Sequence, residues 1–465
     1  MALTLVIVVI ITALLFDFTN GFHDSANAMA TSVATGAFKP RVAVLVAAVF
    51  NFVGASMSVE VAKTISGGIV DDQLIAAAGG VSIVFAGLVG AILWNLLTWL
   101  FGLPSSSSHA MFGGLIGAVL ASAGWAGIHP GVIVSKILLP ALVAPLVAGV
   151  AAGVATRLAY RITDHTAHHA SKTFLMGQRV SASMVALAHG TSDGQKTMGL
   201  ITLVLVVSGY QAGQPGGTRP QEWVIVAAAM AIALGTYSGG WRIMRTMGKG
   251  LVEIESPQGF AAETAATATI LASSHLGFGL STTHVCSGAI LGSGVGRQTK
   301  VNWGIASRMM SAWLLTLPAA GLVGAGACLV TKQGPWGFFV MLGVLIAACL
   351  VIVRISHIHK VDHTNVTDSG KVKVLPGRKV RGSKRRISFV KIPKAVKLAD
   401  DVPTPSLSAT PGHVASPSGA PAASPAPVLV SADTIAATRP AVKVVPRRRR
   451  TWRLVISDES KAVTV

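Results

Sequence analysis

Long apolar stretches recur along most of the chain and are separated by short polar segments. A helix of about 20 apolar residues is long enough to cross the hydrocarbon core of a bilayer, and several stretches reach that length. The stretches cover approximately residues 2–20, 42–60, 74–101, 103–122, 130–156, 182–208, 222–238, 260–295, 303–330 and 336–353. The pattern predicts an all-α, polytopic transmembrane helical bundle.

Four polar clusters interrupt the apolar pattern at membrane depth. They occupy residues 20–27, 104–109, 189–196 and 281–284. Irregular backbone and polar side chains are tolerated inside a membrane only where protein buries them or water reaches them. We therefore expect these clusters, rather than the apolar helices between them, to line the working cavity.

The clusters form two pairs in the same order, which predicts an internal repeat. Residues 21–29 (GFHDSANAM) align with residues 190–198 (GTSDGQKTM) at an offset of 169. Residues 102–109 (GLPSSSSH) align with residues 277–284 (GFGLSTTH) at an offset of 175. Interrupted apolar segments in corresponding positions are typical of secondary transporters, whose site lies at the membrane midplane between repeats. We predict two inverted repeats, each with a broken or re-entrant hydroxyl-rich hairpin.

The chain divides into four segments on this basis. The first transmembrane repeat covers residues 1–156 and the second covers residues 180–360. Residues 157–179 are predicted to form a basic loop, which the positive-inside rule places in the cytoplasm. Residues 361–465 are rich in Pro, Ser and basic residues. We expect a disordered tail there, because this composition cannot bury a core.

Composition agrees with a membrane protein and changes the meaning of the net charge. The chain is 51% hydrophobic and 12% charged, whereas soluble domains carry about 25% charged residues. Of the net charge of +20, residues 361–465 contribute +12 (19 basic against 7 acidic) and residues 1–360 contribute +8 (19 against 11). The excess belongs mainly to the tail, where contact with anionic lipid or solvent is expected. No recognition motif accompanies it, so nucleic-acid binding is not predicted.

The two hydroxyl-rich clusters have the pattern of helix N-termini. Each follows a Gly or Pro turn and precedes an apolar, Gly-punctuated helix, which would bring hydroxyls and free N–H groups to the positive end of a helix dipole. Such ends bind oxyanions without a formal positive charge. The predicted anion-binding residues are Ser105, Ser106, Ser107, Ser108, Ser281, Thr282 and Thr283. The alternative is that these hydroxyls only join helices within the membrane.

Each of the other two clusters holds one acidic residue, Asp24 in the first repeat and Asp193 in the second. An ionisable group at membrane depth costs about 2.5–3.5 kcal/mol on insertion scales, so such residues are functional candidates. With the amides of Asn27 and Gln195, they offer oxygen ligands for Na⁺ or a protonatable site for H⁺. Lys196 either pairs with Asp193 or faces the anion. The alternative is a buried pair that only fixes helix packing.

Four histidines lie in the same clusters as supporting candidates: His23, His109, His189 and His284. Histidine titrates near neutral pH and could carry a proton. A structural hydrogen-bond donor beside a helix start is the alternative. The three cysteines lack metal-ligand spacing. No metal site or cofactor is therefore predicted, apart from a coupling ion that is H⁺ or Na⁺.

The four motifs together resemble those of the inorganic phosphate transporter (Pit/PiT) family, in particular bacterial low-affinity phosphate permeases. Residues 21–27 and 189–196 are similar to its paired signature motifs, and residues 102–109 and 281–284 to its hydroxyl-rich hairpins. The resemblance implies secondary active uptake of inorganic phosphate across the plasma membrane, in some members as a divalent metal–phosphate complex. It also implies that the acidic motifs bind the coupling cation and the hairpins bind phosphate.

Two positions depart from the family pattern, which typically has Asn before each signature Asp. Here these positions are His23 and Ser192. The loss of two amide oxygens weakens a Na⁺ site, and the histidine next to Asp24 favours coupling to H⁺.

Two rival functions are an intramembrane Ser/His/Asp hydrolase and a passive anion channel. A hydrolase needs one activated nucleophile with a base and an orienting group. Runs of hydroxyls and duplicated motifs suit a symmetric binding cavity better, so we expect a transporter rather than an enzyme. A homodimer is left open, and arsenate would fit the same geometry as phosphate.

Overall fold

The computed structural model describes residues 2–163, 167–368, 442–446 and 452–456. The chain divides into two compact units, residues 1–381 and residues 382–465. The described part of the second unit is a pair of strands, β1 (Val442–Pro446) and β2 (Trp452–Ile456). The described α-helices of the first unit are α1 (Ala2–Ala34), α2 (Pro40–Ala55), α3 (Glu60–Gly67), α4 (Asp72–Ala77), α5 (Gly80–Leu100), α6 (Ser107–Ala123), α7 (Pro130–Ile133), α8 (Leu139–Thr163), α9 (Ala167–Val207), α10 (Glu222–Ser238), α11 (Trp241–Arg245), α12 (Ser256–His275), α13 (Thr282–Arg297), α14 (Trp303–Thr331) and α15 (Pro335–Ile358).

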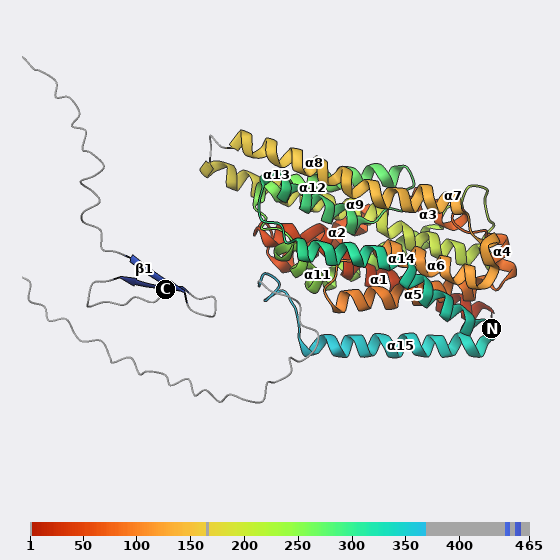
Figure 1. The fold of residues 1–465 in the computed structure, drawn as a ribbon. Coiled ribbons are helices and arrows are strands. Elements are labelled where there is room, and N and C mark those ends of the chain that lie inside the picture. The colour runs from red at the N-terminus through yellow and green to blue at the C-terminus, as the bar shows by residue number, and fades with distance from the viewer. Residues whose placement is uncertain (1, 164–166, 369–441, 447–451, 457–465) are drawn as a thin grey trace, which may run out of the picture. The chain divides into compact units, whose positions relative to one another are not determined.

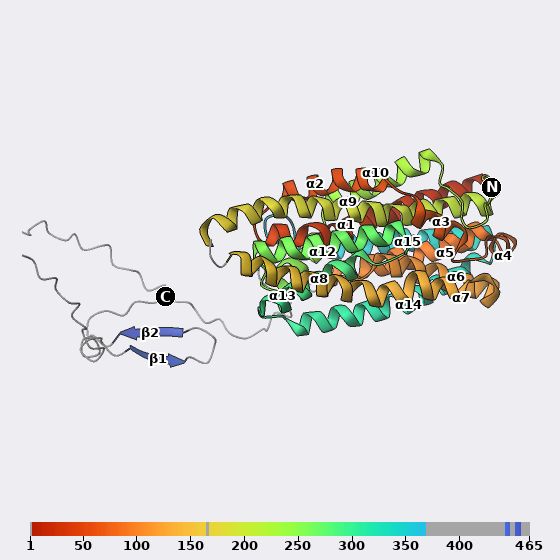
Figure 2. The ribbon, with the colours of Figure 1, turned by 90° about the horizontal axis from the view of Figure 1, so that it is seen from above.

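The helices of the first unit include two three-helix groups (Figures 1 and 2). One group consists of α5, α6 and α14, and the other of α12, α13 and α8. The long helices α1 and α9 contact members of both groups, and α2 and α10 pack against them. The repeat alignment pairs α5 with α12 and α6 with α13, so the two groups contain corresponding segments of the two repeats.

Six of the described helices are long and apolar enough to cross a membrane. Two bent helix pairs raise the number to eight if each pair counts as one span; the bends are 66° between α2 and α3 and 55° after α10. The prediction of an all-helical polytopic bundle is therefore confirmed. The inverted relation of the repeats stays a prediction.

The two hydroxyl-rich clusters lie where helices begin, as predicted. Ser106 caps α6 and accepts a hydrogen bond from His109 N at 3.1 Å. Ser281 caps α13 and accepts one from His284 N at 3.2 Å. In both repeats a glycine with a positive φ follows the preceding helix: Gly102 after α5 and Gly277 after α12. Each hairpin thus has an unwound segment followed by a capped helix N-terminus.

The two acidic clusters do not interrupt their helices, contrary to the prediction. They lie inside α1, which has 33 residues, and α9, which has 41, so the first span does not end at residue 20. The reason is that the glycines of these clusters serve close packing. A Cβ on Gly21 would lie 2.3 Å from Ile232 O, and one on Gly190 would lie 2.2 Å from Asn51 O. Glycine is used there because neighbouring helices approach at backbone contact.

Glycines also determine how both hairpin helices pack. A Cβ on Gly117 of α6 would lie 2.0 Å from Gly321 O of α14. A Cβ on Gly292 of α13 would lie 1.9 Å from Gly149 O of α8. Gly117 and Gly292 correspond at the offset of 175, so the matched hairpin helices are held against their partners in the same way.

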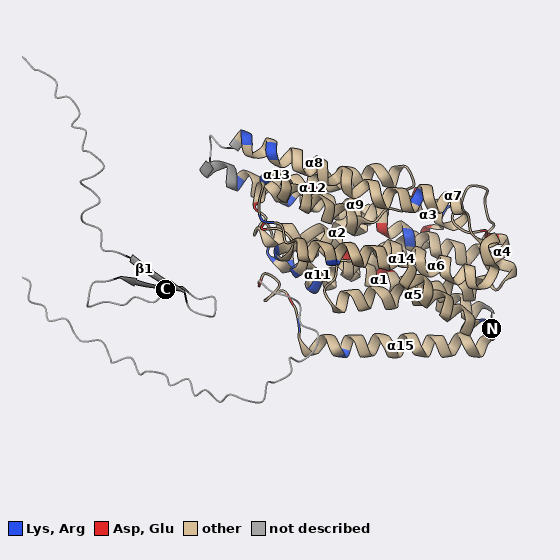
Figure 3. Ribbon diagram, in the orientation of Figure 1, with Lys and Arg blue, Asp and Glu red and all other residues tan. Residues whose placement is uncertain are grey.

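Residues 157–163 and 167–179, the described part of the predicted basic loop, are helical. They belong to α8 and α9. The basic side chains bind carbonyl groups of neighbouring segments: Arg157 Nε donates to Gly296 O at 3.3 Å, and Arg179 Nε donates to Ala37 O at 2.8 Å. Figure 3 shows that many of the Lys and Arg residues of the helical unit lie at this end.

Part of the tail has regular structure where we predicted disorder. Strands β1 and β2 pair antiparallel, with Val444 opposite Leu454. β-branched and aromatic residues around these positions favour strands, a local signal that the composition of the whole tail conceals. The rest of the predicted disordered segment lies outside the described residues, at 369–441, 447–451 and 457–465.

Candidate functional site

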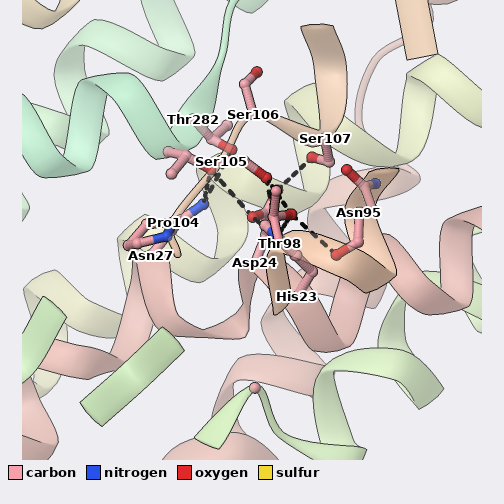
Figure 4. Close-up of polar contacts among 12 residues, drawn as sticks. His23, Asp24, Asn27, Asn95, Thr98, Pro104, Ser105, Ser106, Ser107 and Thr282 are labelled. Atoms are coloured by element: carbon pink, nitrogen blue, oxygen red, sulfur yellow. Dashed lines mark hydrogen bonds and ion pairs between the residues drawn. The ribbon is translucent and has the colours of Figure 1, made fainter. Parts of the chain in front are cut away.

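The first acidic residue, Asp24 of α1, lies at the centre of a buried network of hydroxyl groups (Figure 4). Its Oδ2 accepts a hydrogen bond from Ser107 Oγ at 2.5 Å, and its Oδ1 accepts one from Thr283 Oγ1 at 3.1 Å. Asp24 is 1% exposed. The hairpin helices of both repeats therefore bind the same carboxylate in a site closed to solvent.

His23 connects this carboxylate to two further hydroxyls (Figure 4). Its Nδ1 lies 2.7 Å from Asp24 Oδ1. Its Nε2 lies 3.3 Å from Ser105 Oγ and 3.5 Å from Thr98 Oγ1. The imidazole thus joins the carboxylate and the hydroxyls into one path of groups that can exchange protons.

The second acidic residue, Asp193 of α9, has a corresponding network with an added cation. Its Oδ2 accepts a hydrogen bond from Thr282 Oγ1 at 3.0 Å and lies 3.1 Å from His189 Nε2. Lys196 Nζ donates to Asp193 Oδ1. The structure therefore has the predicted pairing of Lys196 with Asp193, and a role in facing the anion stays a prediction. Both side chains are buried.

The two acidic sites adjoin each other. One ligand atom each from Asp24, His189 and Asp193 lies within 4.8 Å of the other two, and all three residues are buried. Carboxylate and imidazole ligands at this spacing can hold a cation. The contacts join residues up to 259 positions apart, so the four polar clusters of the sequence meet in one place.

The hydroxyl groups of the two hairpins are engaged with helix ends and acidic sites. Ser106 and Ser281 cap their helices. Ser107, Thr282 and Thr283 bind the carboxylates. Ser105 and Ser108 contact other polar groups of the site. The first backbone N–H groups of a helix have no intrahelical acceptor. An oxyanion at these ends would therefore meet N–H donors beside hydroxyls that are already oriented.

The two amides proposed as cation ligands lie in different places. Asn27 Nδ2 donates to Thr283 Oγ1 at 3.0 Å, and its buried Oδ1 has no hydrogen-bond partner among the described residues. Gln195 Oε1 instead accepts a hydrogen bond from Val61 N at 2.8 Å. The oxygen of Gln195 is thus engaged at the start of α3, whereas that of Asn27 is available at the acidic site.

Two of the supporting histidines contact each other. The ring centroids of His109 and His284 are 4.9 Å apart, and the ring of His284 lies 4.2 Å from that of Trp313. Both histidines are the third residue of their hairpin helix. Their contact therefore joins the first turns of α6 and α13, which fixes the distance between the two predicted anion-binding ends.

A further buried acid, Glu263 of α12, was not singled out from the sequence. Its carboxylate accepts hydrogen bonds from Thr31 Oγ1 and Ser181 Oγ, both at 2.5 Å, and from Gln178 Nε2 at 3.1 Å. An acid inside an apolar stretch was the available signal. The repeat alignment does not identify Glu263 as a candidate, because the corresponding residue of the first repeat is Leu88.

Unwound segments and helix N-termini at a polar site inside a bundle of membrane spans are typical of secondary transporters, whose substrate and ion sites lie between the repeats. The fold and site therefore define a membrane transporter. Comparison with known proteins then gives its family.

Residues 20–324 match the phosphate transporter family. A probable low-affinity inorganic phosphate transporter of Mycobacterium leprae is 50% identical over 371 residues, which cover 79% of this chain and 88% of that protein. The corresponding protein of Rhizobium meliloti is 41% identical over 341 residues, covering 70% and 96%. The solved structure of a sodium-dependent phosphate transporter has a similar fold, with a TM-score of 0.64 and 23% identity, and covers 71% of this chain and 99% of that chain.

The chain belongs to the phosphate transporter family, as its four motifs predict. Its membership confirms a multi-pass membrane transporter rather than an enzyme, and thereby excludes the hydrolase alternative.

Proposed function

We propose that the protein imports inorganic phosphate across the plasma membrane by symport with a cation, and that this cation is H⁺ rather than Na⁺. The observation that carries the proposal is the meeting of two hairpin N-termini with Asp24 and Asp193 in one buried site. The relatives named as inorganic phosphate transporters support phosphate as the anion.

The charge balance of the site supports coupling between anion and cation. With Asp24 and Asp193 ionised, Lys196 charged and the histidines neutral, these side chains carry a net charge of −1. A phosphate ion at the hairpin N-termini would be repelled by this charge, and repulsion is strong in a buried site of low dielectric constant. One cation at Asp24 brings the net charge to zero. Cation and anion then favour each other's binding, which symport requires.

Two features of the Asp24 site favour a proton as this cation. His23 links the carboxylate to Ser105 through contacts of 2.7 and 3.3 Å, and the two ring nitrogens of an imidazole can donate and accept a proton. The site is also short of amide oxygens for Na⁺, because His23 and Ser192 stand where the family typically has Asn.

In the proposed cycle, the outward-facing protein first takes up H⁺ at Asp24. Phosphate then docks on the N-termini of α6 and α13, and movement of one repeat against the other exposes the site to the cytoplasm. The end of the helical unit that carries many Lys and Arg residues (Figure 3) is the cytoplasmic end under the positive-inside rule.

The test is uptake of labelled phosphate into proteoliposomes under an imposed pH gradient or Na⁺ gradient, with and without Mg²⁺. We expect uphill accumulation that is driven by an inward proton gradient and unaffected by Na⁺. Accumulation driven only by Na⁺ would overturn the proposed coupling ion, and downhill flux alone would indicate a channel. A strict requirement for Mg²⁺ would identify a metal–phosphate complex as the substrate.

A further inference from the structure

Lys196 is held by three oxygen atoms in the interior of the protein. Its Nζ donates to Asp193 Oδ1 and to Ser108 Oγ, and to Leu280 O at 3.0 Å. The side chain is 1% exposed. A buried ammonium group needs an acceptor for each of its three protons, and Lys196 has all three.

These acceptors are also the kinds of ligand that an alkali cation uses. In transporters, backbone carbonyls of unwound segments coordinate Na⁺ together with side-chain oxygens. Leu280 belongs to the unwound segment between α12 and α13, and Asp193 and Ser108 add a carboxylate and a hydroxyl. Lys196 Nζ therefore lies at a point that has the oxygen ligands of a Na⁺ site.

The first repeat has the same frame of contacts around its own acid. Ser107 Oγ donates to Asp24 Oδ2 at 2.5 Å, and its counterpart Thr282 Oγ1 donates to Asp193 Oδ2 at 3.0 Å. Asp24 and Asp193 correspond at the offset of 169, and Ser107 and Thr282 at the offset of 175. The contacts of the two sites thus match as the sequences do.

The second contact of each carboxylate shows where the sites differ. In the first repeat, Thr283 Oγ1 donates directly to Asp24 Oδ1 at 3.1 Å. The counterparts of this pair are Ser108 and Asp193, and Lys196 Nζ lies between them and binds both. A direct hydrogen bond in one site is replaced by a bridging cation in the other.

The two acidic sites differ because a single position of the repeat holds different residues. The first repeat has Asn27 where the second has Lys196, and Asn27 Nδ2 donates to Thr283 Oγ1 at 3.0 Å as Lys196 does to its counterpart Ser108. We propose that Lys196 is a resident cation that permanently fills one of two matched cation sites, so that Asp24 alone binds an exchangeable cation. This inference rests on the proposed function and adds to it a ratio of one coupling cation per phosphate.

Lys196→Asn tests the inference, because it removes the resident charge and leaves an amide oxygen beside the carboxylate, hydroxyl and carbonyl oxygens that bind Lys196. Lys196→Met is the matched control, since it removes the charge at similar side-chain length but supplies no oxygen ligand. The unfolding temperature of the purified, detergent-solubilised proteins is measured in NaCl and in choline chloride at equal ionic strength and pH. We expect Na⁺ to raise the unfolding temperature of Lys196→Asn by about 2 °C or more, and to leave the wild type and Lys196→Met unchanged.

Two outcomes of this measurement would overturn the inference. One is an equal response of Lys196→Asn and Lys196→Met to Na⁺. The other is a Na⁺-specific rise in the wild type that Asp193→Asn removes, because the site would then accept Na⁺ in the presence of the lysine.

A measurement on the wild type decides the question if the variants do not fold. The initial rate of phosphate uptake into proteoliposomes is measured against the concentration of the coupling cation. We expect a hyperbolic dependence, as for a single cation, and a sigmoidal dependence would overturn the inference. Absence of any cation-driven uptake by the wild type would contradict the proposed function instead, and the Na⁺ response of the unfolding temperature would still decide the role of Lys196.

Discussion

In an Asp24→Asn background, replacing Asp193 by Asn should destabilise the folded protein, because Asp193 neutralises a buried lysine. Among the described residues, Asp193 is the one acid within ion-pair distance of Lys196, and the two side chains are 0% and 1% exposed. Removing one partner of a buried ion pair costs about 3–5 kcal/mol, since the remaining charge stays buried and uncompensated. Asp24 has no Lys or Arg partner among the residues that the structure describes, only hydroxyl donors and His23.

The contacts favour the lower end of that range. Lys196 keeps two of its three acceptors in Asp193→Asn, namely Ser108 Oγ and Leu280 O. Loss of the charge also removes repulsion from Asp24, whose ligand atom lies within 4.8 Å of that of Asp193. That repulsion is about 3 kcal/mol at an effective dielectric constant of about 20. The cost of the broken pair is therefore measured most cleanly in an Asp24→Asn background, where we expect about 3 kcal/mol.

The assay is a double-mutant cycle of Asp193→Asn and Lys196→Met in that background, followed by equilibrium unfolding in mixed detergent micelles at fixed pH and ionic strength. Each single change leaves one buried charge without its partner, whereas the double change leaves none. We expect the double variant to be more stable than the sum of the single losses predicts, by about 2–3 kcal/mol. Additive losses would refute the reasoning, whatever the size of each.

Three further predictions concern other parts of the structure. Asp24→Asn should abolish proton-driven phosphate uptake into proteoliposomes without loss of unfolding free energy, and wild-type uptake would contradict its role as the coupling site. Gly190→Ala should cost about 1–3 kcal/mol, because its Cβ would lie 2.2 Å from a carbonyl oxygen of α2, whereas Gly326→Ala, with nothing within 4 Å, should be neutral or slightly stabilising in the same unfolding assay. Arg297 lowers the pKa of the Glu255 carboxyl, so this pair stabilises the protein above the unfolded pKa of about 4.3 and loses its effect as the pH falls through the folded value. Because Glu255 is 59% exposed, the effect should stay below about 1 kcal/mol, and Glu255→Gln should remove it from the pH dependence of unfolding.

The hairpin N-termini could be predicted from the sequence because their signals are local. A hydroxyl residue after a Gly or Pro turn and before an apolar helix predicts a cap, and Ser106 and Ser281 are the caps. The repeat alignment then predicts that the two ends are equivalent. The contact between the two ends through His109 and His284 could not be predicted, since no local pattern indicates which helices face each other.

The continuity of α1 and α9 could not be predicted, and this affected the choice of site residues. Gly, Asp and Asn favour turns in isolation, but Gly190 is required by close packing and Asp193 by its partners. In an unbroken helix, residues three or four apart share a face, whereas residues two apart do not. Lys196 and His189 therefore lie on the same face as Asp193, and Gln195 does not.

The difference between the two acids follows from their closeness. Two ionised carboxylates with oxygens within 4.8 Å of each other repel by at least about 3 kcal/mol, so a duplicated site of two identical acids would resist holding both charges. Lys196 offsets one charge in every state of the protein, whereas a bound cation offsets the charge of Asp24 only while it is present. In the proposed cycle, phosphate binding therefore depends on one exchangeable charge, that of the cation at Asp24. An unloaded Asp24 repels the anion and a loaded one admits it, which prevents phosphate from crossing without its cation.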